Sequence, residues 1–186
     1  MDNTFNINID PALAEQYNSG SAVKAGGFFV VEHVRNGEVI DTQISENIVV
    51  DEGLTHILDV ALSGGSQDTT WFVGIFKNNY TPVAGNVAST FAGAGVAGEA
   101  TTEIDETTRP AWTEAGVTSK TITNSASPAT FTANTTVSIY GAFLISDNTL
   151  GGTTGTLMAA SKFSSVRNLL STDVLNITYT LTIADA

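Results

Sequence analysis

Hydrophobic and polar residues alternate most regularly near the end of the chain, in residues 173–183 (DVLNITYTLTI). The odd positions from Leu175 to Ile183 are apolar, and the even positions from Asn176 to Thr182 are Asn or Thr. Successive side chains of a strand point to opposite faces, so one face of this segment is apolar and the other carries threonine. The pattern predicts a long antiparallel strand with one face on a core and the other toward water.

A second extended pattern surrounds the dipeptide Asn36-Gly37. Residues 28–34 and 38–44 flank this pair and are rich in β-branched and apolar residues. A two-residue type I′ turn needs positive φ at both central positions, which Asn and Gly adopt most easily. We therefore expect a β-hairpin. His33 lies in its first arm between charged neighbours, and we expect it to be an exposed strand residue rather than a ligand.

Residues 51–62 have the one clear helical pattern. Their apolar residues recur at steps of three and four and form a single stripe, made of Leu54, Ile57, Leu58, Ala61 and Leu62. Asp51 is suited to cap the N-terminus, and residues 64–65 are both glycine, which favours a left-handed end. His56 and Asp59 fall off the stripe and are expected to face water.

The rest of the chain is mostly extended. Residues 71–76 (WFVGIF) are apolar on both faces, which is typical of a central strand covered on both sides, for example by the preceding helix. Residues 87–98 form a loose helix or a long loop. Further short strands are expected in residues 109–114, 120–124, 128–132, 137–146 (with a bulge at Gly141) and 156–163.

These elements predict a mainly β fold, an antiparallel β-sandwich or jelly roll with one short α-helix at about residues 51–62. An open mixed sheet backed by that helix is the alternative. At 186 residues, the chain fits one domain of residues 27–186 preceded by an N-terminal arm of residues 1–26.

The N-terminal arm has a short alternation of its own. Apolar side chains at Phe5, Ile7 and Ile9 alternate with polar ones, and Leu13 and Tyr17 belong to a stretch long enough for one or two helical turns. One interpretation is a poorly ordered terminus. The other is an arm that docks on a neighbouring subunit, which makes these five residues the candidate interface.

Composition narrows the range of partners. The net charge is −12 with seven Lys and Arg, so binding to nucleic acid or to an anionic membrane surface is disfavoured. Only 14% of residues are charged, against about 25% in typical proteins, and Ser, Thr, Asn and Gly replace them. No apolar run approaches the ~20 residues of a membrane span.

No catalytic constellation is evident. The sequence has no cysteine and lacks the nucleophile-elbow, phosphate-loop and HExxH motifs. A GxGxxG match at residues 93–98 lies in a generally glycine-rich stretch. An acidic run lacks the spacing of a calcium loop and is expected to be a solvated loop; it contains Glu99, Glu103, Asp105 and Glu106. We therefore predict a protein that is not an enzyme, with no catalytic, cofactor-binding or metal-binding residues.

Several stretches taken together resemble structural proteins of tailed-bacteriophage virions. They lie between residues 47 and 186 and include DEGLTHILDVAL, TTWFVGIFKNNYTP, EIDETTRPAW, ITNSASPATFT, IYGAFLIS, GGTTGTLMAASKFSS and LNITYTLTIADA. Within this resemblance we favour a head decoration, or cement, protein. The resemblance implies self-association into dimers or trimers, binding to the major capsid protein lattice, and a location on the capsid surface after assembly in the bacterial host cytoplasm.

Two other functions remain open. A tail- or fibre-associated adaptor would have the same composition. A carbohydrate-binding β-sandwich would expose aromatic side chains to stack on sugars. For that function Trp112, beside Pro110 and Glu114, is the better candidate, whereas Trp71 lies in an apolar strand and is expected to be buried.

Overall fold

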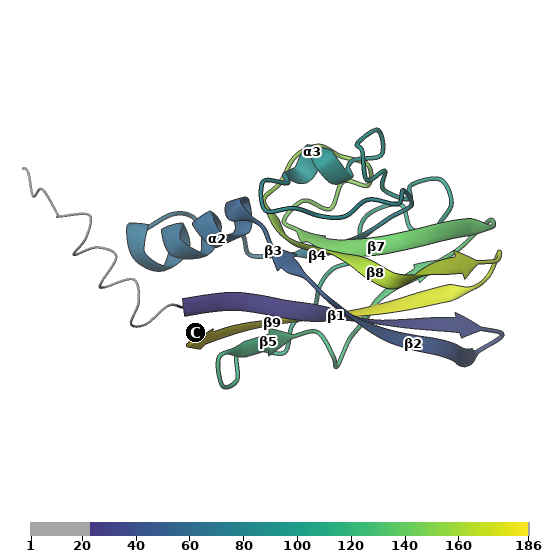
Figure 1. The fold of residues 1–186 in the computed structure, drawn as a ribbon, viewed down its shortest axis with the longest axis horizontal. Coiled ribbons are helices and arrows are strands. Elements are labelled where there is room, and N and C mark those ends of the chain that lie inside the picture. Colours follow the sequence, from purple (N-terminus) through teal and green to yellow (C-terminus); the bar gives the residue numbers. More distant parts are fainter. Residues whose placement is uncertain (1–22, 186) are drawn as a thin grey trace, which may run out of the picture.

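The computed structural model describes residues 23–185, which form two antiparallel sheets packed face to face (Figure 1). The first sheet has the order β2-β1-β9-β5, and β6 also pairs with β9. The second has the order β3-β8-β7-β4. This arrangement confirms the predicted β-sandwich, and the open mixed sheet is wrong. The first sheet contains β1 (Val23–Arg35), β2 (Glu38–Glu46), β5 (Thr121–Thr123), β6 (Ala129–Thr132) and β9 (Val174–Asp185). The second contains β3 (Ile48–Val49), β4 (Phe72–Phe76), β7 (Val137–Ile145) and β8 (Leu157–Leu169).

Strand β9 lies in the middle of the first sheet, as its alternation indicates. Leu175, Ile177 and Tyr179 are buried between the sheets, and the Tyr179 ring stacks on Phe29 of β1 with centroids 4.5 Å apart. The threonines of the other face hydrogen bond to the neighbouring strand, because Thr180 and Thr182 meet the hydroxyls of β5. The period of two therefore determines which side chains of β9 form the core.

The β1–β2 hairpin is confirmed together with its turn. Asn36 and Gly37 have φ values of 54° and 81°, the left-handed pair that a type I′ turn needs. The pairing runs from Phe28 opposite Glu46 to Arg35 opposite Glu38. Strand β1 is longer than β2, so its first residues extend past the end of the hairpin.

The second sheet is covered on both faces. One face packs on the first sheet, and the other carries a second apolar cluster in which the rings of Phe76, Phe91 and Phe143 meet at centroid distances of 5.4 and 4.9 Å. The outer cover comes from the segment after β4, which includes the short helix α3 (Ala88–Phe91), and not from the helix before β4 as expected. A bulge between Ile139 and Gly141 shifts the register of β7 as predicted.

The predicted helix forms over its full expected length but in two parts. Residues Asp51–Leu58 are α-helical (α2), and Asp59–Ser63 form a π-helical turn (η1). Gly64 ends it with φ 76°, as the two glycines indicate. The N-cap residue is Val50, and the expected cap by the Asp51 side chain is wrong because Asp51 is already the first helical residue.

Candidate functional site

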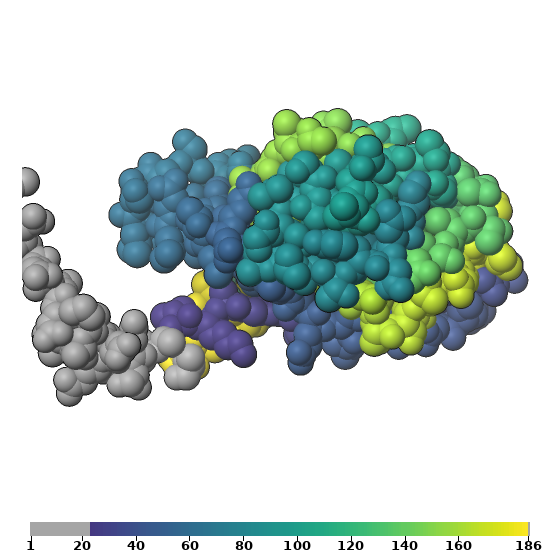
Figure 2. Space-filling view, turned by 45° about the horizontal axis from the view of Figure 1, so that its top comes forward, coloured from purple at the N-terminus to yellow at the C-terminus, as the bar shows by residue number. Residues whose placement is uncertain are grey.

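The helix α2 and the turn η1 stand away from the sandwich as a separate lobe (Figure 2). We call residues 51–63 the leucine arm. Its base is fixed to the second sheet: the Leu157 amide of β8 donates a 2.9 Å hydrogen bond to Glu52, and the Val50 amide donates to the Met158 carbonyl at 3.1 Å. Gly53 lies so close to the Met158 backbone that a side chain would collide with it. These contacts hold the first turn and Ile57 packs against the core, whereas the outer side and the end of the arm project into solvent.

Three leucines of the arm face solvent. Their exposed fraction rises along the arm, from 38% at Leu54 to 60% at Leu58 and 82% at Leu62. The residues are four apart and form one apolar row on the exposed side. The predicted stripe exists, but most of it does not face this chain's core. Only Ile57 of the stripe packs against the core.

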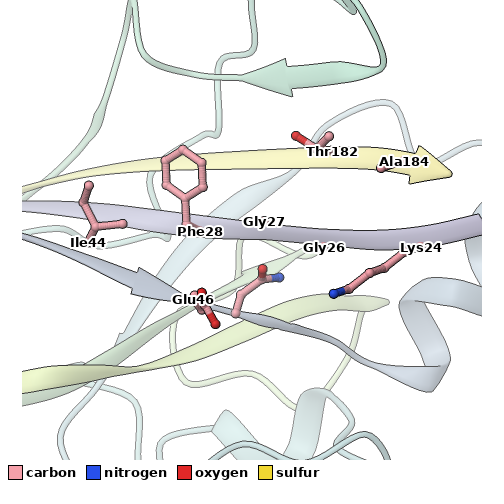
Figure 3. Close-up of a pocket in the computed structure, with 9 residues that line it drawn as sticks. Lys24, Gly26, Gly27, Phe28, Ile44, Glu46, Thr182 and Ala184 are labelled. Atoms are coloured by element: carbon pink, nitrogen blue, oxygen red, sulfur yellow. The ribbon is translucent and has the colours of Figure 1, made fainter. Parts of the chain in front are cut away.

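A shallow groove lies beside the first residues of β1 (Figure 3). It has a volume of about 430 Å³, and its lining residues include Lys24, Gly26, Phe28, Glu46 and Thr182. An added Cβ at Gly26 would meet no atom within 4 Å, so this part of the strand is open above its backbone. Among the described residues, no strand pairs with β1 before Phe28 on the β2 side. This open edge is a surface on which another extended segment can pair.

The residues predicted as an interface, Phe5, Ile7, Ile9, Leu13 and Tyr17, lie outside the described residues. The leucine arm and the open edge of β1 were not predicted as contact surfaces. The sequence did contain a signal for the leucine arm, because its leucines recur at helical spacing and so fall on one side of the helix. Sequence periodicity does not distinguish a stripe that packs on the chain's own core from one that faces outward.

His33 is buried and not exposed as expected. Its Nε2 lies 2.9 Å from Asp173 Oδ2, and the guanidinium of Arg35 donates two hydrogen bonds to the same carboxylate at 2.9 and 2.6 Å. The hydrogen bonds from Arg35, helped by the Leu170 amide and His33, hold the pKa of Asp173 far below its ordinary value against the opposing effect of burial. The cluster joins β1 to the turn before β9 and has a structural role.

The acidic run is solvated as expected only at Asp105, which is exposed. Glu99 is fully buried, and its carboxylate accepts hydrogen bonds from Arg109 at 2.8 and 2.9 Å and from the Gly151 amide at 2.7 Å. Burial raises the pKa of Glu99, and the Arg109 guanidinium opposes part of this shift. Glu103 accepts a 2.7 Å hydrogen bond from Lys77, and Glu106 accepts from the Thr132 amide. These carboxylates therefore serve separate contacts.

The burial of the two tryptophans differs from the expectation, because Trp112 is the more buried of the two. Trp112 is buried, and its indole N–H donates a 3.2 Å hydrogen bond to the Tyr179 carbonyl. Trp71 precedes β4 and is only half-buried, and its ring lies nearly perpendicular to that of His56 at a centroid distance of 5.4 Å. His56 is consequently half-buried instead of solvated. Both indoles line one groove, although they are 41 positions apart in the sequence.

Within residues 23–185, no group of three or more His, Asp or Glu side chains is arranged to hold a metal ion. In the same range, no helix has both the length and the apolar character needed to cross a membrane. No protein-family model matches the chain, and no curated protein matches it.

Proposed function

We propose that this chain is a non-enzymatic structural protein of a tailed-bacteriophage virion, a head decoration protein that self-associates and binds the major capsid protein lattice. The leucine arm is the observation that supports this function best. Burying an exposed leucine side chain contributes about 1.5–3 kcal/mol, so covering three of them on a neighbour provides a substantial part of a stable contact. A large exposed apolar surface is typical of a protein–protein contact site.

The scaffold also suits a permanent assembly. The sandwich is covered on both faces of its second sheet, so it presents its arm and its open β1 edge from a rigid body. Only 14% of the residues are charged, so the hydroxyl-rich surface has few long charged side chains and loses little side-chain entropy when it packs against a neighbour. The resemblance of residues 47–186 to virion proteins supports the assignment to a phage particle, within which we favour a head decoration protein over a tail component.

The leucine arm gives the first test. Leu62→Glu is expected to weaken self-association by about tenfold or more, because it places a charge in an apolar contact. Val96→Glu is the matched control, since Val96 is 66% exposed and lies far along the chain from the arm. Analytical ultracentrifugation measures the oligomeric state, and quantitative gels of reconstituted capsids measure occupancy. A wild-type chain that stays monomeric and does not bind capsids would contradict the proposal.

The N-terminal residues give the second test. We propose that Phe5, Ile7, Ile9, Leu13 and Tyr17 add to the contact with a neighbouring subunit, because the sequence alternates apolar and polar residues at positions 5–9 and continues with further apolar side chains. Deleting residues 1–20 is expected to reduce capsid occupancy while leaving the circular dichroism of the sandwich unchanged. Undiminished occupancy would exclude this role for the segment.

A tail- or fibre-associated adaptor is distinguished by location. A decoration protein is distributed over the whole shell, whereas an adaptor occupies one vertex or the tail. Labelling this chain in purified particles and imaging them by cryo-electron microscopy separates the two, and density confined to the tail would replace the head assignment.

A further inference from the structure

The groove that both tryptophans line has the make-up of a small-ligand site. It has a volume of about 330 Å³, at the lower end of the range for ligand pockets of about 300–1,000 Å³. One wall is formed by residues 67–70, which follow the leucine arm, and the other by residues 111–114. The groove continues into an apolar crevice of about 130 Å³ between the sheets. The crevice shares Trp71, Trp112 and Ile122 with the groove.

The two walls are held together by the backbone. The Trp112 amide donates a 2.7 Å hydrogen bond to the Trp71 carbonyl, and the Val73 amide donates a 2.9 Å bond to Pro110. The Ala115 amide donates to Thr123 of β5, which fixes the far end of the second wall. The indole of Trp112 is anchored by its own hydrogen bond to Tyr179. The groove is therefore formed before any ligand arrives, which lowers the entropic cost of binding.

The lining is divided between an apolar floor and a polar rim. The floor consists of the two indoles and aliphatic side chains. The rim carries neutral hydrogen-bonding groups and two carboxylates, on Gln67, Asp68, Thr69, Thr70, Thr113 and Glu114. No Lys or Arg lines either cavity. The carboxylates of Asp68 and Glu114 disfavour an anionic ligand, and the nearest imidazole, that of His56, already faces Asp68 at 3.9 Å.

We propose that this groove binds a neutral saccharide. A pyranose ring separates apolar and polar surface as the groove does. Its C–H faces are apolar, and its hydroxyls project around the edge. Aromatic rings supply large apolar contact area, and amide, hydroxyl and carboxylate groups can donate to or accept from sugar hydroxyls. An organic ammonium ion would suit the indoles and carboxylates, but it would leave the neutral rim groups of Gln67, Thr69 and Thr113 unused. This site does not depend on the proposed virion function.

The chain itself provides the assay. It contains two tryptophans, and both line the groove, so intrinsic fluorescence reports directly on occupancy. The probes are neutral mono- to tetrasaccharides of glucose, galactose, mannose and N-acetylglucosamine, with galacturonic acid oligomers as the anionic control and choline as the ammonium control. We expect at least one neutral saccharide to shift the emission with saturable millimolar or tighter affinity, and the anionic oligomers to have no effect.

Variants locate the binding. Trp71→Ala is expected to weaken saccharide affinity about tenfold, the loss of one stacking contact. Thr69→Val and Asp68→Asn change only the rim and are expected to weaken it several-fold, whereas Thr153→Val, an exposed threonine elsewhere, leaves it unchanged. If circular dichroism shows that Trp71→Ala does not fold, the saccharide affinities of Thr69→Val and Asp68→Asn test the proposal instead. The proposal is overturned if no neutral saccharide binds, if choline alone binds, or if the rim variants bind as the wild type does.

Discussion

Asp173 joins three segments of the chain through one carboxylate. It accepts hydrogen bonds from Arg35 and from the Leu170 amide and lies 2.9 Å from His33, while its own side chain is only 3% exposed. The carboxylate is charged in the folded protein because these donors favour its ionised form. The cluster therefore makes part of the stability depend on pH.

Asp173→Asn is expected to lower the free energy of unfolding at neutral pH by about 2 kcal/mol, since hydrogen bonds to a charged group are lost. The pKa of Asp173 is lowered from the ordinary 3.8, so its contribution is fully present above that value and is lost as the pH falls below it. Urea unfolding at neutral pH and near pH 3 should show the gap between variant and wild type narrowing in acid. Asp185→Asn, which removes an exposed pair with Lys120, is the control and should change little at either pH.

Arg109 and Glu99 form the most deeply buried ion pair among the described residues, with both side chains at 0% exposure. Arg109 also donates to the Asp147 and Gly152 carbonyls, so it fixes the loop between β7 and β8 against the segment after α3. Removing one partner leaves the other charge buried without compensation.

Arg109→Met is expected to lower the free energy of unfolding by about 3–5 kcal/mol. The matched change Lys77→Met breaks the half-buried pair with Glu103 and is expected to cost about 1 kcal/mol or less. Chemical denaturation of both variants measures the difference. Equal losses would show that burial does not determine the strength of these pairs.

Local patterns in the sequence predicted most elements but not the buried charges, and the strand expected at residues 109–114 is wrong, because only an isolated bridge forms there at Ala111. The Asn36-Gly37 turn and the alternation of β9 follow from the residues themselves, because φ preference and the period of two are local properties. The partner of His33 is distant in the chain, because Asp173 is 140 positions away. Such contacts depend on the sheet order, which local patterns do not specify.

At the scale of elements, the helix of residues 51–63 was predicted correctly, but the solvent exposure of its apolar row was not. The helix and its glycine end form as expected, but attachment at Gly53 and Glu52 turns most of the leucine row outward. The turn η1 is a π-helical segment, a local deviation that is often found at functional sites. The arm combines a regular helix with an exposed apolar face, as a contact element requires.

Strand β7 depends on a glycine at its bulge. A Cβ at Gly141 would lie 2.1 Å from the Phe76 ring and 2.2 Å from the Ser161 carbonyl oxygen, and a backbone atom cannot move aside easily. Gly141→Ala is therefore expected to lower the free energy of unfolding by about 1–3 kcal/mol. Gly26→Ala is the control, because that position has open space above it, and its effect on stability should be small. Thermal unfolding measures both, and a neutral Gly141→Ala would show that the bulge can shift.

At the scale of the whole molecule, the surfaces that we propose for interaction share one end of the sandwich. Figure 1 shows the projecting helix α2, the start of β1 and the end of β9 at that end. The open β1 edge, the leucine arm and the groove lined by Trp71 are thus available to neighbours, while the second sheet is sealed by its own outer cluster. This asymmetry fits a subunit that is fixed by one end to an assembly.

The net charge of −12 determines how the proposed self-association responds to salt. The arm carries Asp51, Glu52 and Asp59 and no Lys or Arg, so two copies meeting through it repel each other. Added salt screens this repulsion, with a Debye length of about 10 Å at 0.1 M and ~3 Å at 1 M, while the apolar contact is retained. We expect self-association to become tighter, by about tenfold, between low salt and 0.5 M NaCl in sedimentation equilibrium. Leu62→Glu adds a fourth charge to the arm and should make the dependence steeper. Dissociation on adding salt would instead indicate that ion pairs hold the copies together and that the leucine row is not the contact.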